Sequence, residues 1–113
     1  TIHDRQISRH GGAAGLRDRG LLEAAVARPL NKWQYGTTDL FDLAAAYAFG
    51  IAKAHAFVDG NKRTALVSSL TFLLANGQHV LRPTDDTVKA IEDLAQDIVI
   101  EETFAGWLRD GIR

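Results

Sequence analysis

The chain has 113 residues, a formal net charge of −1 and no cysteine, which fits one small domain. The missing cysteines exclude disulfides, cysteine-bound zinc and thiol catalysis, and a reducing compartment suits such a chain. The balanced charge lacks the field expected of a general nucleic-acid binder, and no apolar run reaches the roughly 18 residues of a membrane span. We expect a single domain over residues 1–113, with an N-terminus trimmed before Thr1.

Glycine and proline residues divide the first part of the chain into short segments. Residues 2–9 are typical of the end of a helix, which a pair of glycines then stops. Asp18 is a suitable N-cap for a second helix, which we expect to run to about Arg28 and to stop at Pro29. A loop or short extended piece is predicted over residues 30–38.

The middle of the chain predicts two buried helices joined by a short link. Asp39 is expected to cap a helix that ends near His55 and is apolar on nearly every face, as central, buried helices are. A second helix is predicted from about Asn61 to Ala75, where Asn76 and a glycine supply a C-cap. Because the link holds only a few residues, the two helices must fold back as neighbours.

The last third of the chain predicts two shorter helices. Thr84 is expected to cap the first, after an extended link over residues 78–82, and two aspartates in its first turn suit the helix dipole. The second is predicted near Glu101 to Asp110. The fold class that these elements indicate is all-α.

The link between the two central helices carries the candidate site. Its sequence is His55-Ala56-Phe57-Val58-Asp59-Gly60-Asn61-Lys62-Arg63. The start of the second helix has free backbone N–H groups and a partial positive charge, which together bind anions. Gly60 permits a turn with positive φ and leaves room for a ligand near the backbone, and Asn61 can cap the helix or donate from its amide. Lys62 and Arg63 lie where the dipole disfavours cations, which an anionic ligand would explain.

Two further side chains of the link suit phosphate chemistry. Asp59 can pair with the cations or give a hard oxygen ligand to a magnesium ion that bridges phosphates. His55 lies at the rim, where a neutral imidazole can take a proton from an incoming hydroxyl. Phe57 is expected to anchor the turn in the core. Each residue alone has an ordinary structural explanation, but their convergence on one joint between buried helices favours a functional one.

The string from His55 to Arg63 resembles the signature of the Fic/Doc superfamily, His-x-Phe-x-Asp/Glu-Gly-Asn-Gly/Lys-Arg. Residues 2–4, 7–12 and 38–41 resemble the death-on-curing (Doc) branch of that family. The resemblance covers nearly the whole chain, although the C-terminal third matches only in its helical pattern. It implies a single helical bundle of about six helices.

Two positions differ from the AMP-transferring Fic enzymes and resemble Doc toxins instead. Lys62 stands where those enzymes have glycine, and Leu66 stands where they have a second arginine. The resemblance therefore implies a kinase that transfers the γ-phosphate of ATP to a threonine of elongation factor Tu and stops translation. It implies that His55 is the base and that Asp59 holds Mg²⁺. The nucleotide-binding residues that it implies are Lys53, Gly60, Asn61, Lys62 and Arg63.

The resemblance also implies a partner, an antitoxin of the Phd type, and a bacterial or phage-encoded cytoplasmic protein. Trp33 and Tyr35 can line a groove for this antitoxin, whereas the helical spacing of Phe104 and Trp107 indicates core positions. Two alternatives stay open. One is transfer of AMP, because Gly60 makes the turn more Fic-like; the other is a non-enzymatic module that binds a partner through the same surface.

Overall fold

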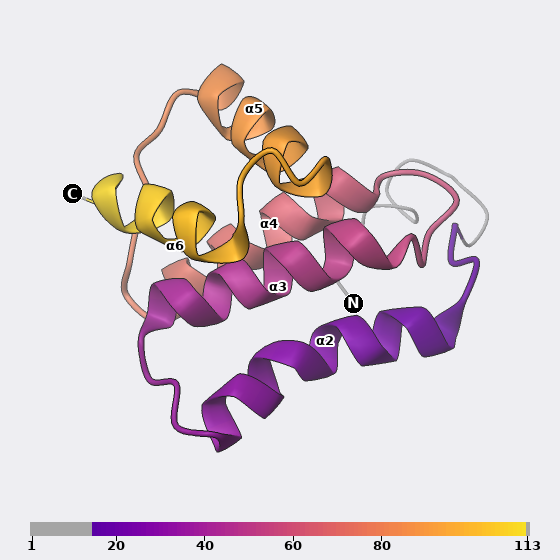
Figure 1. Ribbon diagram of the computed structural model, residues 1–113. Coiled ribbons are helices and arrows are strands. Elements are labelled where there is room, and N and C mark those ends of the chain that lie inside the picture. The colour runs from indigo at the N-terminus through magenta and orange to yellow at the C-terminus, as the bar shows by residue number, and fades with distance from the viewer. Residues whose placement is uncertain (1–14, 113) are drawn as a thin grey trace.

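The computed structural model describes residues 15–112, which form five helices and two isolated β-bridges (Figure 1). The helices are α2 (Arg19–Gln34), α3 (Leu40–Ala54), α4 (Asn61–Ala75), α5 (Thr84–Ala95) and α6 (Glu101–Asp110). The fold is all-α, as expected. The helix predicted over residues 2–9 lies outside the described residues. Within residues 15–112, no helix has the length and apolar character needed to cross a membrane.

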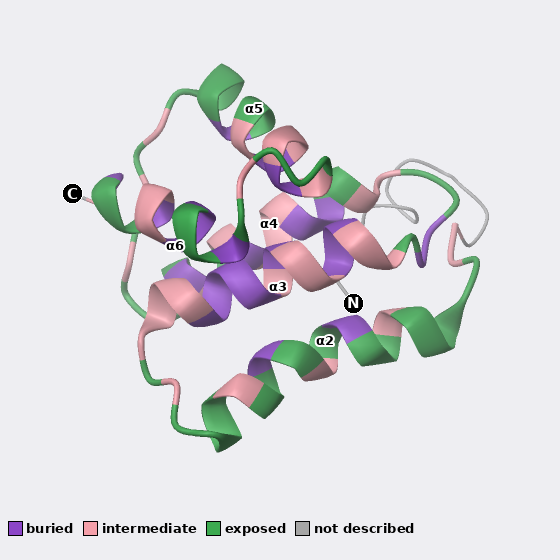
Figure 2. Ribbon diagram, in the orientation of Figure 1, coloured by how far each residue is buried: buried purple, intermediate pink, exposed green. Residues whose placement is uncertain are grey.

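The central element is α3, which contacts α2, α4, α5 and α6. Figure 2 shows buried residues along much of its length. Five of its alanines are at most 2% exposed: Ala44, Ala45, Ala46, Ala48 and Ala52. Their small side chains allow neighbouring helices to approach α3 from several directions. The predicted central, buried helix is therefore confirmed.

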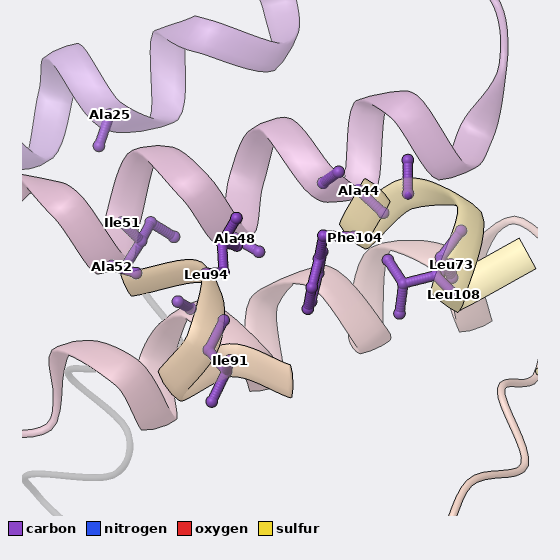
Figure 3. Close-up of a cluster of buried hydrophobic side chains, with 13 residues drawn as sticks. Ala25, Ala44, Ala48, Ile51, Ala52, Leu73, Ile91, Leu94, Phe104 and Leu108 are labelled. Atoms are coloured by element: carbon purple, nitrogen blue, oxygen red, sulfur yellow. The ribbon is translucent and has the colours of Figure 1, made fainter. Parts of the chain in front are cut away.

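Larger apolar side chains fill the space around these alanines (Figure 3). Leu73 comes from α4, Ile91 and Leu94 from α5, and Phe104 and Leu108 from α6, and all five are at most 3% exposed. Burial of each such side chain contributes roughly 1.5–3 kcal/mol to stability. The predicted core position of Phe104 is confirmed, and Trp107 is half-buried against the same cluster.

Helix α2 continues through Pro29 to Gln34, so the predicted end at Arg28 was wrong. The first five residues of the loop predicted over residues 30–38 are therefore helical. Arg28 and Lys32 are four residues apart and share one face of the helix. Both bind the carboxylate of Glu101, which is buried in the first turn of α6, with 2.6 Å between Lys32 Nζ and Glu101 Oε2. This long-range ion pair holds the second half of α2 against the bundle. The proline removes only one helical hydrogen bond.

Two of the three predicted N-caps are confirmed, and Asn76 is the C-cap of α4, as predicted. The Asp18 carboxylate accepts a hydrogen bond from the Leu21 amide, and the Asp39 carboxylate caps α3 in the same way. Thr84, in contrast, is not the cap of α5. Pro83 stands just before the helix in an extended conformation, and its carbonyl accepts the first bonds from the α5 amides.

The close contact between α2 and α3 depends on Gly50. A Cβ atom at this position would lie 2.9 Å from the carbonyl oxygen of Ala25, which belongs to backbone and cannot move aside cheaply. We expect Gly50→Ala to lower the free energy of unfolding by about 1–2 kcal/mol, because the clash outweighs the better helix propensity of alanine. Chemical denaturation measures this change.

The matched control is Gly106→Ala in α6, where a Cβ would meet nothing within 4 Å. There the propensity term acts alone, so stability should stay the same or rise by up to about 1 kcal/mol. Equal effects of the two substitutions would contradict the close approach of α2 to α3.

Candidate functional site

The link between α3 and α4 turns through two residues in the left-handed region. His55 ends α3 with φ 51° and ψ 37°, and Gly60 precedes α4 with φ 79°. The predicted positive φ of Gly60 is thus confirmed. Ala56 and Phe57 are at most 2% exposed, which confirms that Phe57 anchors the turn. The link is therefore a short, anchored connection that places α3 beside α4 (Figure 1).

Asn61 closes this link with two hydrogen bonds to one residue. The Phe57 amide donates to Asn61 Oδ1 at 3.1 Å, and Asn61 Nδ2 donates to the Phe57 carbonyl at 2.9 Å. The side chain therefore does not cap α4, whose N-cap is Gly60. It shapes the turn that precedes the helix, and its role in nucleotide binding stays a prediction.

The start of α4 has the features of an anion-binding site. Gly60 offers no side chain to the helix, no side-chain cap is formed, and the first turn holds no acidic residue. Lys62 and Arg63 are exposed at the same end. Backbone N–H groups with a partial positive charge thus lie beside two cations. This arrangement suits a ligand with several negative charges, such as a polyphosphate.

Asp59 lies in the link directly before this helix. One carboxylate oxygen accepts a hydrogen bond from the Gly60 amide at 2.8 Å, and the residue is exposed. No salt bridge joins it to Lys62 or Arg63, which weakens the purely structural explanation. Residues 15–112 contain no cluster of three or more acidic, histidine or cysteine ligands. A single exposed carboxylate still fits Mg²⁺, which commonly takes one or two carboxylates together with phosphate oxygens and water.

His55 and Lys53 lie near each other in sequence but have different surroundings. The His55 side chain is exposed, and no side chain in the described range hydrogen-bonds to its imidazole. Lys53 Nζ instead donates to Asp97 Oδ2 at 2.7 Å and to the Ala95 carbonyl at 3.1 Å, at the end of α5. The Lys53 ammonium group is therefore already paired with groups at and after the end of α5. Its role in nucleotide binding stays a prediction.

A segment that the sequence analysis did not assign to the site, residues 15–18, braces the link. The amides of Arg17 and Asp18 donate to the Ala56 carbonyl, and the Val58 amide donates to the Gly15 carbonyl. The Arg17 guanidinium also donates to the carbonyl of His55. These contacts join positions about forty residues apart in sequence. Neither periodicity nor spacing could reveal them, and Asp18 was recognised only as a helix cap.

The sequence profile of the Fic/DOC family matches residues 1–73, which include the whole link and most of α4. The chain belongs to the Fic/Doc family. It is 46% identical over 81 residues to a protein of Escherichia phage P1 named "Protein kinase doc", a match that covers 71% of this chain and 64% of that protein. It is 44% identical over 95 residues to "Toxin Doc" of Mycolicibacterium smegmatis, with 81% and 71% covered. These relatives confirm the resemblance to the Doc branch, and the chain spans just under two thirds of the phage protein.

The two hydrogen bonds of Asn61 should contribute to the stability of the fold. We expect Asn61→Ala to lower the free energy of unfolding by about 1–2 kcal/mol, because both bonds close a partly buried turn. Thermal or chemical denaturation measures the change.

Asn76→Ala is the matched control, since Asn76 Nδ2 also donates to a carbonyl four residues earlier, that of Phe72, but at an exposed helix end. This substitution should cost about 0.5 kcal/mol or less. If the two variants lost equal stability, Asn61 would be an ordinary surface side chain and not the residue that closes the link.

Proposed function

We propose that this chain is a Doc-type toxin that transfers the γ-phosphate of ATP to a hydroxyl of elongation factor Tu and thereby arrests protein synthesis. The observation that carries the proposal is the start of α4, which has no side-chain cap and holds Lys62 and Arg63, with the exposed Asp59 and His55 in the link before it. The name of the phage relative, a protein kinase, supports the same chemistry. The target and the arrest of translation rest on the family resemblance.

In the proposed reaction, the residues of the link divide the work of phosphoryl transfer. His55 takes the proton of the target hydroxyl while the hydroxyl oxygen forms a bond to the γ-phosphorus. The bond between the γ-phosphorus and the β–γ bridging oxygen breaks at the same time. ADP leaves, and His55 passes its proton to solvent. Lys62, Arg63 and the first amides of α4 hold the phosphate oxygens in place. Such positioning and charge neutralisation supply most of the catalysis in phosphoryl transfer.

Asp59 is the residue that would hold Mg²⁺. The bound ion would supply charge neutralisation across the phosphates of ATP. The carboxylate is available for this role because, within residues 15–112, one of its oxygens is engaged, by the Gly60 amide, and the other is not.

The environment of Leu66 favours phosphate transfer over AMP transfer. Leu66 lies about one turn into α4, at the position of the second arginine of AMP-transferring Fic enzymes. It packs against the hydrophobic core and is half-buried. An apolar side chain there cannot hold a phosphate, so the cations that the first two turns of α4 supply are Lys62 and Arg63.

We also propose a Phd-like antitoxin as the partner of this chain, because a relative is named a toxin. Trp33 and Tyr35, at the end of α2, are 59% and 91% exposed. Trp33 lines an apolar groove of about 260 Å³ that also includes Leu43 of α3 and Phe72 of α4. An apolar segment of the antitoxin would bury these side chains. A cytoplasmic location belongs to the same proposal.

Replacement of His55 should abolish transfer while the fold is kept. Because His55 has a positive φ, His55→Asn is the better variant beside His55→Ala, since asparagine tolerates this conformation and cannot act as the base. Loss of a general base should lower the rate by roughly 10²–10⁴-fold. The measurement is the intact mass of purified elongation factor Tu after incubation with ATP and Mg²⁺, in which a transferred phosphate adds about 80 Da.

The control for this experiment is His79→Ala, which removes an exposed histidine in the link between α4 and α5. It should leave the rate unchanged. A His55 variant that transfers phosphate as fast as the wild type would show that the base lies elsewhere.

Lys62 should decide which part of ATP is transferred. We expect Lys62→Gly to lose phosphate transfer and to gain at most weak AMP transfer, because glycine removes a phosphate ligand but Leu66 still supplies no cation. Adding Leu66→Arg should raise AMP transfer. The intact mass of the target separates the outcomes, because an adenylyl group adds about 329 Da and a phosphate about 80 Da.

Circular dichroism first establishes that each Lys62 variant is folded, since Leu66 is half-buried. A wild-type protein that already adds the adenylyl mass would replace the kinase proposal by AMP transfer. The absence of any modification by every variant would leave a binding module as the surviving function.

A further inference from the structure

We propose that Arg17 is a positioning residue for His55. The Arg17 guanidinium holds the backbone carbonyl of His55. The inference rests on the proposed function, because it takes His55 as the base. Arg17 Nη2 donates to the His55 carbonyl oxygen at 2.5 Å. The contact links the segment before α2 to the residue that ends α3.

The conformation of His55 explains why such a contact is needed. His55 and Asp97 are the two residues other than glycine that have positive φ within residues 15–112. A side chain with a Cβ atom disfavours this region, so surrounding contacts must hold the residue there. The conformation also sets the direction in which the imidazole leaves the backbone. A contact that fixes it therefore fixes the base.

The other bonds of the brace hold the residues after His55 and not His55 itself. The amides of Arg17 and Asp18 donate to the Ala56 carbonyl at 2.7 and 3.0 Å, and the Val58 amide donates to the Gly15 carbonyl at 2.7 Å. All three bonds join backbone atoms. Within residues 15–112, the Arg17 side chain is the group that hydrogen-bonds to the His55 carbonyl.

The position of the guanidinium also suits this role electrostatically. The carbonyl of His55 follows the last turn of α3, where unpaired carbonyl groups give the helix a partial negative charge. A cation is stabilised at this end, whereas the anion-binding end of α4 repels it. The contact of Arg17 is thus with the backbone of the base at the end of α3, whereas Lys62 and Arg63 belong to the start of α4.

Loss of the Arg17 side chain should therefore disturb the base without unfolding the protein. The backbone bonds of the brace remain in Arg17→Ala, so the link stays attached to residues 15–18. The peptide group between His55 and Ala56 gains freedom, and the imidazole is held less well. A displacement of about 1 Å at a catalytic group can cost on the order of 10²-fold in rate.

The test compares the full-length wild type with Arg17→Ala and Arg17→Lys in phosphate transfer to elongation factor Tu. We expect kcat to fall by about tenfold or more in Arg17→Ala, while the KM for ATP changes by less than about twofold. Arg17→Lys should recover much of kcat, because lysine can also donate to the carbonyl. Arg19→Ala is the matched control, since it removes another exposed cation two residues away, whose Nε lies 3.6 Å from Glu23 Oε1, and it should leave both constants unchanged.

Two kinetic results would overturn the proposal. One is a kcat of Arg17→Ala within about twofold of the wild type. The other is a raised KM for ATP with unchanged kcat, which would make Arg17 a nucleotide ligand instead.

A second readout is independent of activity and separates this inference from the proposed function. The ¹³C chemical shifts of the His55 backbone report its left-handed conformation in the protein without nucleotide. They should change in Arg17→Ala and stay as in the wild type in Arg19→Ala. If the wild type transfers no phosphate, the proposed function fails, but these shifts still decide whether Arg17 holds His55. His55 shifts in Arg17→Ala that equal those of the wild type would refute that role.

Discussion

The packing of every other described helix against α3 is the constraint on which the structure depends. Five of the six alanines of α3 are almost inaccessible, and α2, α4, α5 and α6 all contact this helix. Small side chains let several helices approach one axis, and leucine, isoleucine and phenylalanine side chains of the surrounding helices pack against them (Figure 3). The end of α3 and the start of α4 are thereby fixed in space, and the candidate site lies between them.

Such a fixed frame allows the link to hold backbone conformations that an isolated peptide would rarely adopt. Gly60 takes positive φ at little cost because it lacks a Cβ atom. His55 takes it only with support, which comes from the buried Ala56 and Phe57, from Asn61 and from the segment over residues 15–18. Functional residues are often held in sparsely populated conformations by their surroundings. In this chain the support comes from two separate parts of the sequence, the link itself and residues 15–18.

The sequence predicted the features that local patterns encode. The apolar pattern identified α3 as a buried helix and located α4, although only four residues of α4 are buried. Asp18 and Asp39 identified the N-caps of α2 and α3, and the string from His55 to Arg63 identified the link and the family. The family signature was decisive there, because each residue of the link also has an ordinary structural explanation.

The features that the sequence did not predict depend on contacts between distant residues. Glu101 of α6 binds Arg28, just before Pro29, and Lys32, three residues after it. This contact stabilises the part of α2 that follows the proline. Lys53 binds Asp97, and Arg17 binds the carbonyl of His55. Hydrophobic periodicity carries no information on such pairs, since they form only when separate helices have packed.

The central claim is that the link between α3 and α4 catalyses transfer of the terminal phosphate of ATP to a protein hydroxyl. The most direct test incubates the wild type and His55→Asn in a bacterial lysate with ATP that is labelled, in parallel reactions, on the γ- or the α-phosphate. The account predicts that the wild type transfers only the γ-label to a protein of the lysate, and that His55→Asn transfers neither label. Incorporation of the α-label by the wild type, or of no label at all, would contradict it.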